Sequence, residues 1–401
     1  MNSATTLKLF NKPFLDQLIL TPSLLPFTDK EILQLDSDLN QYEQLFLDPD
    51  IEKNLISKNE LLASFAISKA ENSSLTLQEA QDLYAFILSN KDYSFISEKI
   101  KAKKKITRKD YEKLEFFNIA KTFRNSQTIR IEEVTPQFIQ ELHIQLTQGL
   151  DVFQSYLPDF DVYRSGQWRN SDTIRVGAHI PAPYILINEG VSELLSWLKN
   201  NQTITSVGIF HTALYALHPF NNGNKRVSRI IEHIFLRALH INEKNLYSTS
   251  YYYHKEKERY YKYLLFSLER KNLNHFTAFF QEALVLSMLS VIKTSLETKR
   301  KFFLDNQTLD SQIRLICKPL IKKHEIQFKN LLKVSQGKMA RQTFVNYLQQ
   351  AVNQKILIRR KNGKTTFYSL NISPKEEVTF TNMLEFIQAK LSFIPDDIRT
   401  S

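Results

Sequence analysis

Apolar residues recur at helical spacing through the first third of the chain. Between residues 28 and 125 they repeat every three or four positions, which is typical of helices that bury one face. Thr76 and Glu79 have the spacing of a capping box, in which both side chains bind amides at a helix start. The helix that follows would carry on one face Ala80, Leu83, Tyr84 and Ile87. We therefore expect a helical N-terminal region over residues 1–125.

The stretch from Tyr163 to Asn188 has a different pattern. Aromatic and β-branched residues alternate there with Pro and Gly. Pro181 and Pro183 cannot continue a helix, and Ile185 to Ile187 favour extended backbone. The pattern predicts a long loop with a short β-hairpin, and a loop of that length inside a compact domain is usually functional.

Two strongly apolar segments follow, and a short polar loop separates them. The first begins at Ser206 and stops at His218, which is followed by Pro219. The second runs from Val227 to Ala238 as an unbroken apolar stripe at helical spacing. We expect two buried helices that flank the polar loop, within a core domain over residues 126–295.

The C-terminal part has shorter elements. The strands Ile356–Arg360 and Thr365–Leu370 would be joined across Asn362-Gly363, a favoured two-residue hairpin turn. Three helices and a hairpin describe a winged-helix domain, expected over residues 305–372, with a helical tail over 373–401. The three short helices are predicted at Gln312–His324, Phe328–Val334 and Ala340–Val352.

Composition and charge limit the possible partners and cellular location only in part. The net charge is +11, which raises the expectation of a polyanionic partner, although a solvated basic surface explains it equally well. Cys317 is the only cysteine, so no internal disulfide can form, and a reducing, cytoplasmic location is expected. We expect no stretch long enough to cross a bilayer and no membrane partner.

The polar loop and the start of the second helix concentrate candidate chemistry. Gly223, Asn224 and Lys225 would place a glycine turn before free helix-end amides, which suits a phosphate. Arg226 and Arg229 lie on one side of that helix, where guanidinium groups can bind phosphate oxygens. His218 ends the preceding helix, and an imidazole there is a candidate general base.

This loop resembles the signature of the Fic family. The signature runs His, any residue, Phe, any residue, Asp or Glu, Gly or Ala, Asn, Gly or Lys, Arg, two free positions and Arg. The chain matches from His218 through Phe220 to Arg229, except that Asn222 replaces the carboxylate that usually holds magnesium. Neighbouring features agree with the resemblance over about residues 61–285. No Walker loop or protein-kinase motif competes with it.

The resemblance implies roles for residues outside the loop. Glu71 and Asn72 look like the end of a degraded copy of the family's inhibitory motif, in which Ile67 replaces the hydroxyl residue and Glu71 pairs with Arg229. An ordinary helix end is the alternative explanation. Tyr260 and Tyr261 resemble a tyrosine pair near the nucleotide base, although an aromatic stripe in the core explains them equally well. A target segment would dock by strand addition on the flap. The flap residues are Gly177, Ala178, His179 and Ile180.

The fold class expected from these patterns is mainly α, with a Fic-type helical core, a short β-hairpin flap and a C-terminal winged helix. The resemblance implies a protein adenylyltransferase that moves AMP from ATP to a hydroxyl of a target protein, with Mg2+ held mainly by the phosphates and weakly by Asn222. The target, the donor nucleotide and a homodimeric state stay open.

The alternative function is a DNA-binding regulator with an inactive or nucleotide-sensing core. In that interpretation the third short helix reads base edges and the hairpin grips phosphate. The base-reading residues would be Arg341, Gln342 and Asn346, and the phosphate-binding residues would be Arg359, Arg360, Lys361 and Lys364.

Overall fold

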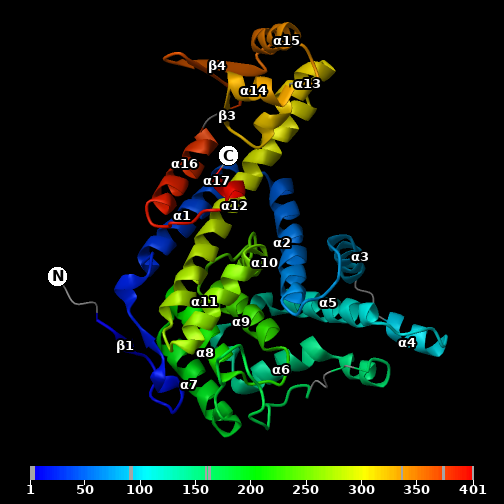
Figure 1. Cartoon of the computed structure of the whole chain (residues 1–401), viewed down its shortest axis with the longest axis vertical. Coiled ribbons are helices and arrows are strands. Elements are labelled where there is room, and N and C mark those ends of the chain that lie inside the picture. Colours follow the sequence, from blue (N-terminus) through cyan, green and yellow to red (C-terminus); the bar gives the residue numbers. More distant parts are fainter. Residues whose placement is uncertain are drawn as a thin grey trace. The chain divides into compact units, whose positions relative to one another are not determined.

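The computed structural model describes residues 5–89, 94–158, 160, 164–335, 337–372 and 375–399. The chain is 66% helix and 6% strand, which confirms the expectation of a mainly α fold with small sheets (Figure 1). Two compact units can be distinguished. Unit 1 comprises Met1–Asp36 and Lys53–Ser287, and unit 2 comprises Ser37–Glu52 and Met288–Ser401.

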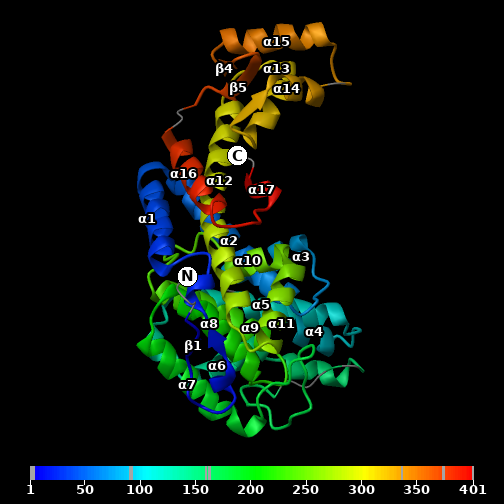
Figure 2. The same ribbon diagram turned by 60° about the vertical axis from the view of Figure 1, so that its left-hand side comes forward.

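Unit 1 is a helical body around two packed central helices, α8 (Ile204–Leu217) and α9 (Asn224–Ala238). Nearly every residue of both helices is buried, as the two apolar segments predict. Two short strands, β1 (Leu7–Lys8) and β2 (Ile19–Leu20), pair antiparallel near the N-terminus. The other helices of the unit are α3 (Leu77–Leu88), α4 (Phe95–Lys101), α5 (Arg108–Asn125), α6 (Pro136–Thr147), α7 (Ile187–Asn200), α10 (Thr249–Lys255) and α11 (Lys257–Glu269). Helix α8 packs against both α7 and α9, and the turned view labels all three (Figure 2).

Three helices cross the boundary between the units as the chain runs along them. These are α1 (Asp29–Phe46), α2 (Pro49–Lys69) and α12 (Asn274–Asp305). The capping box at the start of α3 is present. The Thr76 amide donates to Glu79 Oε2 at 2.8 Å, and the Glu79 amide donates to Thr76 Oγ1 at 3.2 Å.

Helix α12 corrects one expectation. It contains an 18-residue window with a mean hydropathy of 1.4, long and apolar enough to cross a membrane by length and composition. The sequence-based statement that no stretch reaches that length was therefore wrong. Since 83% of the window is buried inside the protein, the apolar residues are those of a core helix.

The segment Ile185 to Ile187 is also not extended as predicted. Tyr184–Leu186 forms a short 3₁₀ helix, and Ile187 is the first residue of α7. The β-branched residues favour a strand locally, but Ile187, Val191 and Leu194 are fully buried on one face of α7. Burial of a helical stripe outweighs the weak local preference for extended backbone.

Unit 2 contains the C-terminal elements. After α12 come α13 (Ser311–Cys317), a 3₁₀ turn (Lys318–Ile321), β3 (Glu325–Gln327), α14 (Phe328–Ser335) and α15 (Arg341–Asn353). Then β4 (Leu357–Asn362) and β5 (Thr365–Leu370) form a hairpin, and the antiparallel sheet has the order β3-β5-β4. Helices α16 (Lys375–Gln388) and α17 (Asp396–Arg399) follow.

Three details of unit 2 differ from the predictions. The first helix ends at Cys317 rather than at His324, because Pro319 follows and cannot continue α-helical hydrogen bonding. The strand β3 was not predicted. Asn362 pairs with Thr365, so the turn residues are Gly363 and Lys364, one position later than expected, with Gly363 at φ 57°.

Candidate functional site

A cavity of about 560 Å³ in unit 1 brings the polar loop together with segments far from it in sequence. It is bounded by the end of α2, the start of α5, the flap, the α8–α9 loop and α11. The sequence-predicted residues that line it are Glu71, Gly177, His218, Asn222, Gly223, Asn224, Lys225 and Tyr261. Further lining residues include Arg108, Tyr111, Ile174, Arg175, Val176, Tyr215, Asn221, Leu264 and Leu265.

His218 caps the C-terminus of α8 in the left-handed region, at φ 50° and ψ 62°. Non-glycine residues rarely adopt this conformation, and they do so where the surroundings fix it. Arg169 provides that fixation, because its Nε donates to the His218 carbonyl at 2.8 Å and its amide donates to the Pro219 carbonyl at 2.8 Å. The Tyr215 ring packs edge-on against the imidazole, with centroids 5.4 Å apart.

The imidazole of His218 is 9% exposed, and burial lowers its pKa to about 4, with the charge of Arg169 acting in the same direction. The ring is therefore neutral at physiological pH and can accept a proton. Its Nδ1 is buried and has no hydrogen-bond partner among the described residues. A neutral, partly accessible imidazole on a polar cavity is suited to act as a general base.

The start of α9 has the geometry of an anion nest. Gly223 precedes the helix at φ 82°, a conformation that favours glycine, and the first amides of a helix have no partner within it. A Cβ on Gly223 would lie 3.1 Å from His143 Nε2 and 3.3 Å from Arg226 Nη2, so a side chain there would be tightly packed as well as strained by the positive φ. The Asn224 side chain closes the loop, accepting from the Phe220 amide at 3.0 Å and donating to the Phe220 carbonyl at 2.7 Å.

His143 of α6 contacts the same loop through a hydrogen bond and a ring stack. The Gly166 amide donates to its Nδ1 at 2.9 Å, which leaves the hydrogen on Nε2 to donate to the Asn222 carbonyl at 3.0 Å. The ring stacks on Phe220 at 3.9 Å between centroids. Burial lowers the pKa of His143 to about 4, so the neutral tautomer required by these two bonds is the stable form.

Glu71 lies in the turn that follows α2 and faces Lys225. Its Oε2 is 3.4 Å from Lys225 Nζ, and the same ammonium donates to the Ala70 carbonyl at 3.3 Å. Tyr261 also donates to that carbonyl, at 2.9 Å. Burial opposes ionisation of Glu71, but the positive charges of Lys225 and Arg226 outweigh it and lower the pKa of the carboxyl. Glu71 is therefore a carboxylate inside an otherwise basic cavity.

The expected partner of Glu71 was wrong in one respect. The carboxylate pairs with Lys225, whereas Arg229 donates to the Ala66 carbonyl at 3.2 Å and stacks over Tyr260 at 4.5 Å. Arg229 still lowers the pKa of Glu71 through its charge, by less than Lys225 and Arg226 do. Arg229 is therefore buried in the core, and its charge affects the pKa of Glu71 without a direct contact.

Several predicted nucleotide-binding residues do not line the cavity. Arg226 is fully buried in an ion pair with Glu115 at 2.8 Å. Tyr260 is fully buried, with its hydroxyl 3.2 Å from His211 Nε2, so the core interpretation holds for it, while Tyr261 reaches the cavity. The residues buried outside the lining are Phe220, Arg226, Arg229 and Tyr260.

The flap forms a minimal hairpin beside the cavity. Val176 and His179 exchange both backbone hydrogen bonds at 3.1 Å around Gly177, which has φ 62°. His179 does not face outward. It is buried, and its Nε2 lies 3.1 Å from the Ala216 carbonyl, so it anchors the hairpin to α8. Ile180 is 60% exposed, and Tyr163, the start of the predicted loop, lies outside the described residues.

Sequence reasoning missed four residues that shape the site: Arg108, His143, Arg169 and Tyr215. Arg108 opens α5 and stacks over Tyr111 at 4.4 Å, so it adds a cation to the cavity. Arg169 ties the flap to the loop through the His218, Leu217 and Ala182 carbonyls. The sequence gives one indication of Arg169, because it is a basic residue in the loop that the pattern predicts to be functional. His143 and Tyr215 sit on ordinary apolar helices, where nothing in the pattern marks them.

A metal site built by the protein does not fit these residues. The described residues contain no group of three or more His, Cys, Asp and Glu side chains placed to hold a metal ion. Asn222 Oδ1 accepts from the Gly223 amide at 2.7 Å. Glu71, the one carboxylate among the lining residues, is paired with Lys225. A hard dication needs several oxygen ligands, which this lining does not offer.

Comparison with known proteins identifies the segment that carries the loop. Residues 133–236 match the Fic/DOC family. This segment is therefore similar to Fic/DOC domains. The matched segment runs from just before α6 to the last turn of α9, and it includes the flap, His218 and the nest.

Individual relatives resemble parts of the chain. A probable protein adenylyltransferase of Aquifex aeolicus (strain VF5) is 32% identical over 113 residues, which are 27% of this chain and 31% of that protein. A Fic family protein from Desulfovibrio desulfuricans G20 has 19% identity and a TM-score of 0.48, over 86% of this chain and 98% of the other. For Fic-1 of C. elegans (residues 134–508) the values are 15% and 0.48, over 68% and 73%.

Proposed function

We propose that this chain is a protein adenylyltransferase, which transfers AMP from ATP to a Ser, Thr or Tyr hydroxyl of a target protein. One observation carries the proposal: a neutral imidazole, that of His218, and the amide end of α9 line the same cavity. The Fic/DOC domain and the name of the Aquifex relative support the same class of reaction.

The lining has the charge that a triphosphate requires. Arg108, Arg175 and Lys225 line the cavity together with Gly223 and Asn224 at the start of α9. Arg226 lies just behind them, with Nη2 3.3 Å from the position of a Cβ on Gly223. Fixed positive charges and dipoles stabilise phosphate oxygens strongly in a site that excludes water. The α-phosphate would bind at the nest, and the outer phosphates would bind toward the cationic side chains.

The reaction follows from this placement. The target hydroxyl oxygen attacks the α-phosphorus, forming a P–O bond to the target. The bond between the α-phosphorus and the oxygen that bridges to the β-phosphate breaks, and pyrophosphate leaves. His218 accepts the hydroxyl proton. Correct positioning and charge stabilisation supply most of the rate in such reactions.

Glu71 would inhibit this reaction. Its carboxylate occupies the basic cavity and pairs with Lys225, a cation that the outer phosphates would otherwise use. A negative charge at that position repels a γ-phosphate and competes for the same ammonium. The inhibitory role of Glu71 therefore depends on Lys225 and not on a direct pair with Arg229.

The target segment would dock on the flap. Gly177 lines the cavity, and Ala178 and Ile180 are exposed beside it. His179 contributes by anchoring the hairpin rather than by contact with the target. An extended target segment could then add along the flap backbone and present its hydroxyl to His218.

Labelling with ATP tagged on the α-phosphate tests the proposal. The full chain should label itself or an added protein, and His218→Ala should reduce labelling by at least about a hundredfold because the proton acceptor is lost. His240→Asn is the matched control, since His240 is exposed and has a left-handed φ of 62° that Asn accepts. The intact mass of the labelled protein should increase by one AMP. Undiminished labelling of His218→Ala would overturn the mechanism.

A further inference from the structure

The positive charge of the chain is concentrated in one segment of unit 2. Residues 311–372 contain 13 Lys and Arg and a single carboxylate, that of Glu325. The whole chain has 53 Lys and Arg against 42 Asp and Glu, so the remaining residues are close to neutral, with 40 basic and 41 acidic side chains. All 13 of these cations except Arg314 are exposed. A net charge of +12 (13 basic residues and one acidic residue) on about 60 residues attracts polyanions.

The exposed face of α15 has an unusual composition for a solvated helix. It lacks Asp, Glu and Lys and consists of Arg341, Thr343 and a series of side-chain amides. Surface helices usually carry Glu and Lys, which favour helix and solubility. Arg and side-chain amides are the groups that bind guanine and adenine edges in pairs of hydrogen bonds. The exposed amide residues are Gln342, Asn346, Gln349, Gln350 and Asn353.

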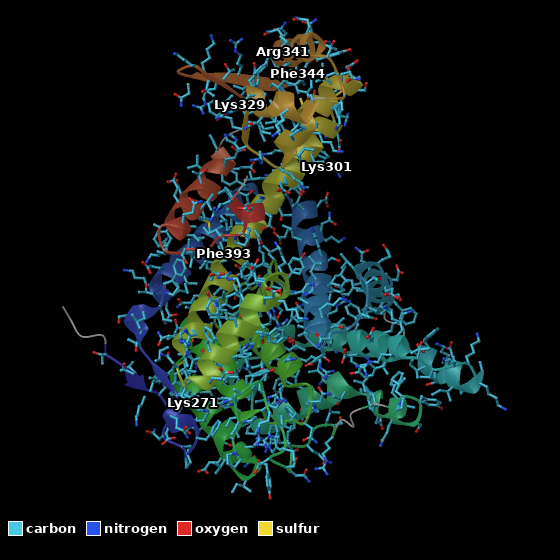
Figure 3. The ribbon with its side chains drawn as sticks, viewed as in Figure 1. Lys271, Lys301, Lys329, Arg341, Phe344 and Phe393 are labelled. Atoms are coloured by element: carbon cyan, nitrogen blue, oxygen red, sulfur yellow. The ribbon has the colours of Figure 1, made fainter. Side chains whose placement is uncertain are left out.

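The helix that bears this face is firmly held. Phe344, Leu348 and Ala351 are buried in the core of the unit on the opposite side of α15. Figure 3 labels exposed Arg341 and buried Phe344 in the first turn of the helix. Hydrogen bonds link Gln342 to Asn346 at 3.1 Å and Gln349 to Asn353 at 2.9 Å along the exposed face. The exposed amide side chains therefore lie on a helix whose opposite face is packed into the core of the unit.

The β4–β5 hairpin supplies cations that are not tied to carboxylates. Lys361 and Lys364 are exposed at its tip, and Arg359 is exposed on β4. Arg360 differs from the sequence-based expectation, because it forms hydrogen bonds of 2.8 and 2.6 Å with both carboxylate oxygens of Glu325. The hairpin thus keeps three of its four predicted phosphate-binding residues available.

We propose that residues 311–372 bind double-stranded DNA, with the exposed face of α15 in the major groove and Lys361 and Lys364 of the hairpin on the phosphate backbone. The major groove of B-form DNA admits a helix and displays the edges that Arg and side-chain amides bind. The deep, narrow major groove of double-stranded RNA does not. This DNA-binding surface is independent of the transferase site in the Fic/DOC domain.

Fluorescence anisotropy of the full chain with a labelled 24-base-pair duplex tests the proposal. With about four phosphate contacts, the affinity should fall about 100-fold between 50 and 200 mM salt. Lys361→Gln with Lys364→Gln removes two contacts, so the same change of salt should then cost only about tenfold. The control is Lys53→Gln with Lys58→Gln, which removes two exposed cations of α2 in unit 1 and should keep the full salt dependence.

A further double variant tests whether α15 recognises specific bases. Selection from a pool of random duplexes should enrich a sequence, and Gln342→Ala with Asn346→Ala should reduce the preference for that sequence at least tenfold while leaving binding to random DNA within twofold. Absence of duplex binding at 50 mM salt would overturn the proposal. An equal reduction of the salt dependence in Lys361→Gln with Lys364→Gln and in Lys53→Gln with Lys58→Gln would also overturn it. Equal affinity for single-stranded RNA and duplex DNA would do the same. His218→Ala should bind DNA like the native chain, so failure of the transferase proposal leaves this test unaffected.

Discussion

Glu71 and Lys225 show how a single pair of residues sets the charge of the site. Among the lining residues Glu71 is the one carboxylate, and three side-chain cations, Arg108, Arg175 and Lys225, line the same cavity. Its lowered pKa means that it stays ionised through the physiological range. The motif in the sequence marked Glu71 as a residue of the site. Its partner, Lys225, depends on how the turn after α2 lies against α9.

Neutralising Glu71 should increase the proposed transfer of AMP. Glu71→Gln keeps the size of the side chain but removes the charge that competes with phosphate for Lys225, so we expect self-labelling by ATP to rise at least several-fold. Glu258→Gln removes an exposed carboxylate from the start of α11 and should have no effect. Labelling by Glu71→Gln at or below the native level would make Glu71 a structural residue.

A carboxylate at position 222 should improve the use of magnesium. Asn222→Asp retains an oxygen that can accept from the Gly223 amide and adds the negative charge that a hard dication prefers. We expect labelling at millimolar Mg2+ to rise severalfold, with little change when Mg2+ is removed by a chelator. A loss of labelling in both conditions would show that the loop is adapted to an amide for another reason.

At the scale of elements, the site depends on the connection between the flap and the α8–α9 loop. Arg169 makes this connection from a fully buried guanidinium that reaches carbonyl oxygens of three segments. The flap is also held by His179, by the Val176–His179 backbone pair and by the Ala182 amide, which donates to the Ala216 carbonyl at 3.4 Å. Loss of Arg169 would therefore release the flap and the unusual backbone of His218 together.

Replacing Arg169 with Lys should separate positioning from charge. Lysine keeps the charge but cannot form the forked contacts, so buried carbonyls lose their donors at a cost of about 1–3 kcal/mol. We expect labelling to fall at least tenfold at temperatures where the protein is still folded. Arg130→Lys, at an exposed position, is the control. Native labelling by Arg169→Lys would remove it from a positioning role.

At the scale of the whole molecule, titration of buried histidines links stability to pH. Burial lowers the pKa of His143, His179 and His218 to about 4 and that of His233 to about 3. In the unfolded chain each titrates near 6.5. Because the unfolded state binds these protons first, the free energy of unfolding should fall as the pH drops from about 7 toward 4.

The expected loss between pH 7.5 and 5.5 is about 1.3 kcal/mol for each histidine, which amounts to about 5 kcal/mol for the four, a large share of the usual stability of a domain. Urea unfolding followed by tryptophan fluorescence measures it, because both tryptophans, Trp168 and Trp197, lie in unit 1 with the four histidines. Equal free energies of unfolding at the two pH values would contradict the prediction.

The order of elements and much of the cavity lining could be predicted from the sequence alone. Apolar periodicity located α8, α9 and the C-terminal helices, because a buried helix face leaves a local pattern. The glycine turn at Gly223 and its neighbours His218 and Lys225 could be identified because one short loop holds them. The separate domain boundaries, the inhibitory role and the winged helix stay predictions.

Only the tertiary structure decided which side chains reach the cavity. Arg226 and Tyr260 fit the sequence pattern as well as Lys225 and Tyr261 do, yet Glu115 and the aromatic core bury them. Arg108 and Arg169 reach the site from segments more than 45 residues away from His218, so no local pattern could assign them to it. A local pattern records which face of a helix is buried, whereas the partner of a charged side chain depends on contacts between distant segments, which the sequence of one segment does not contain.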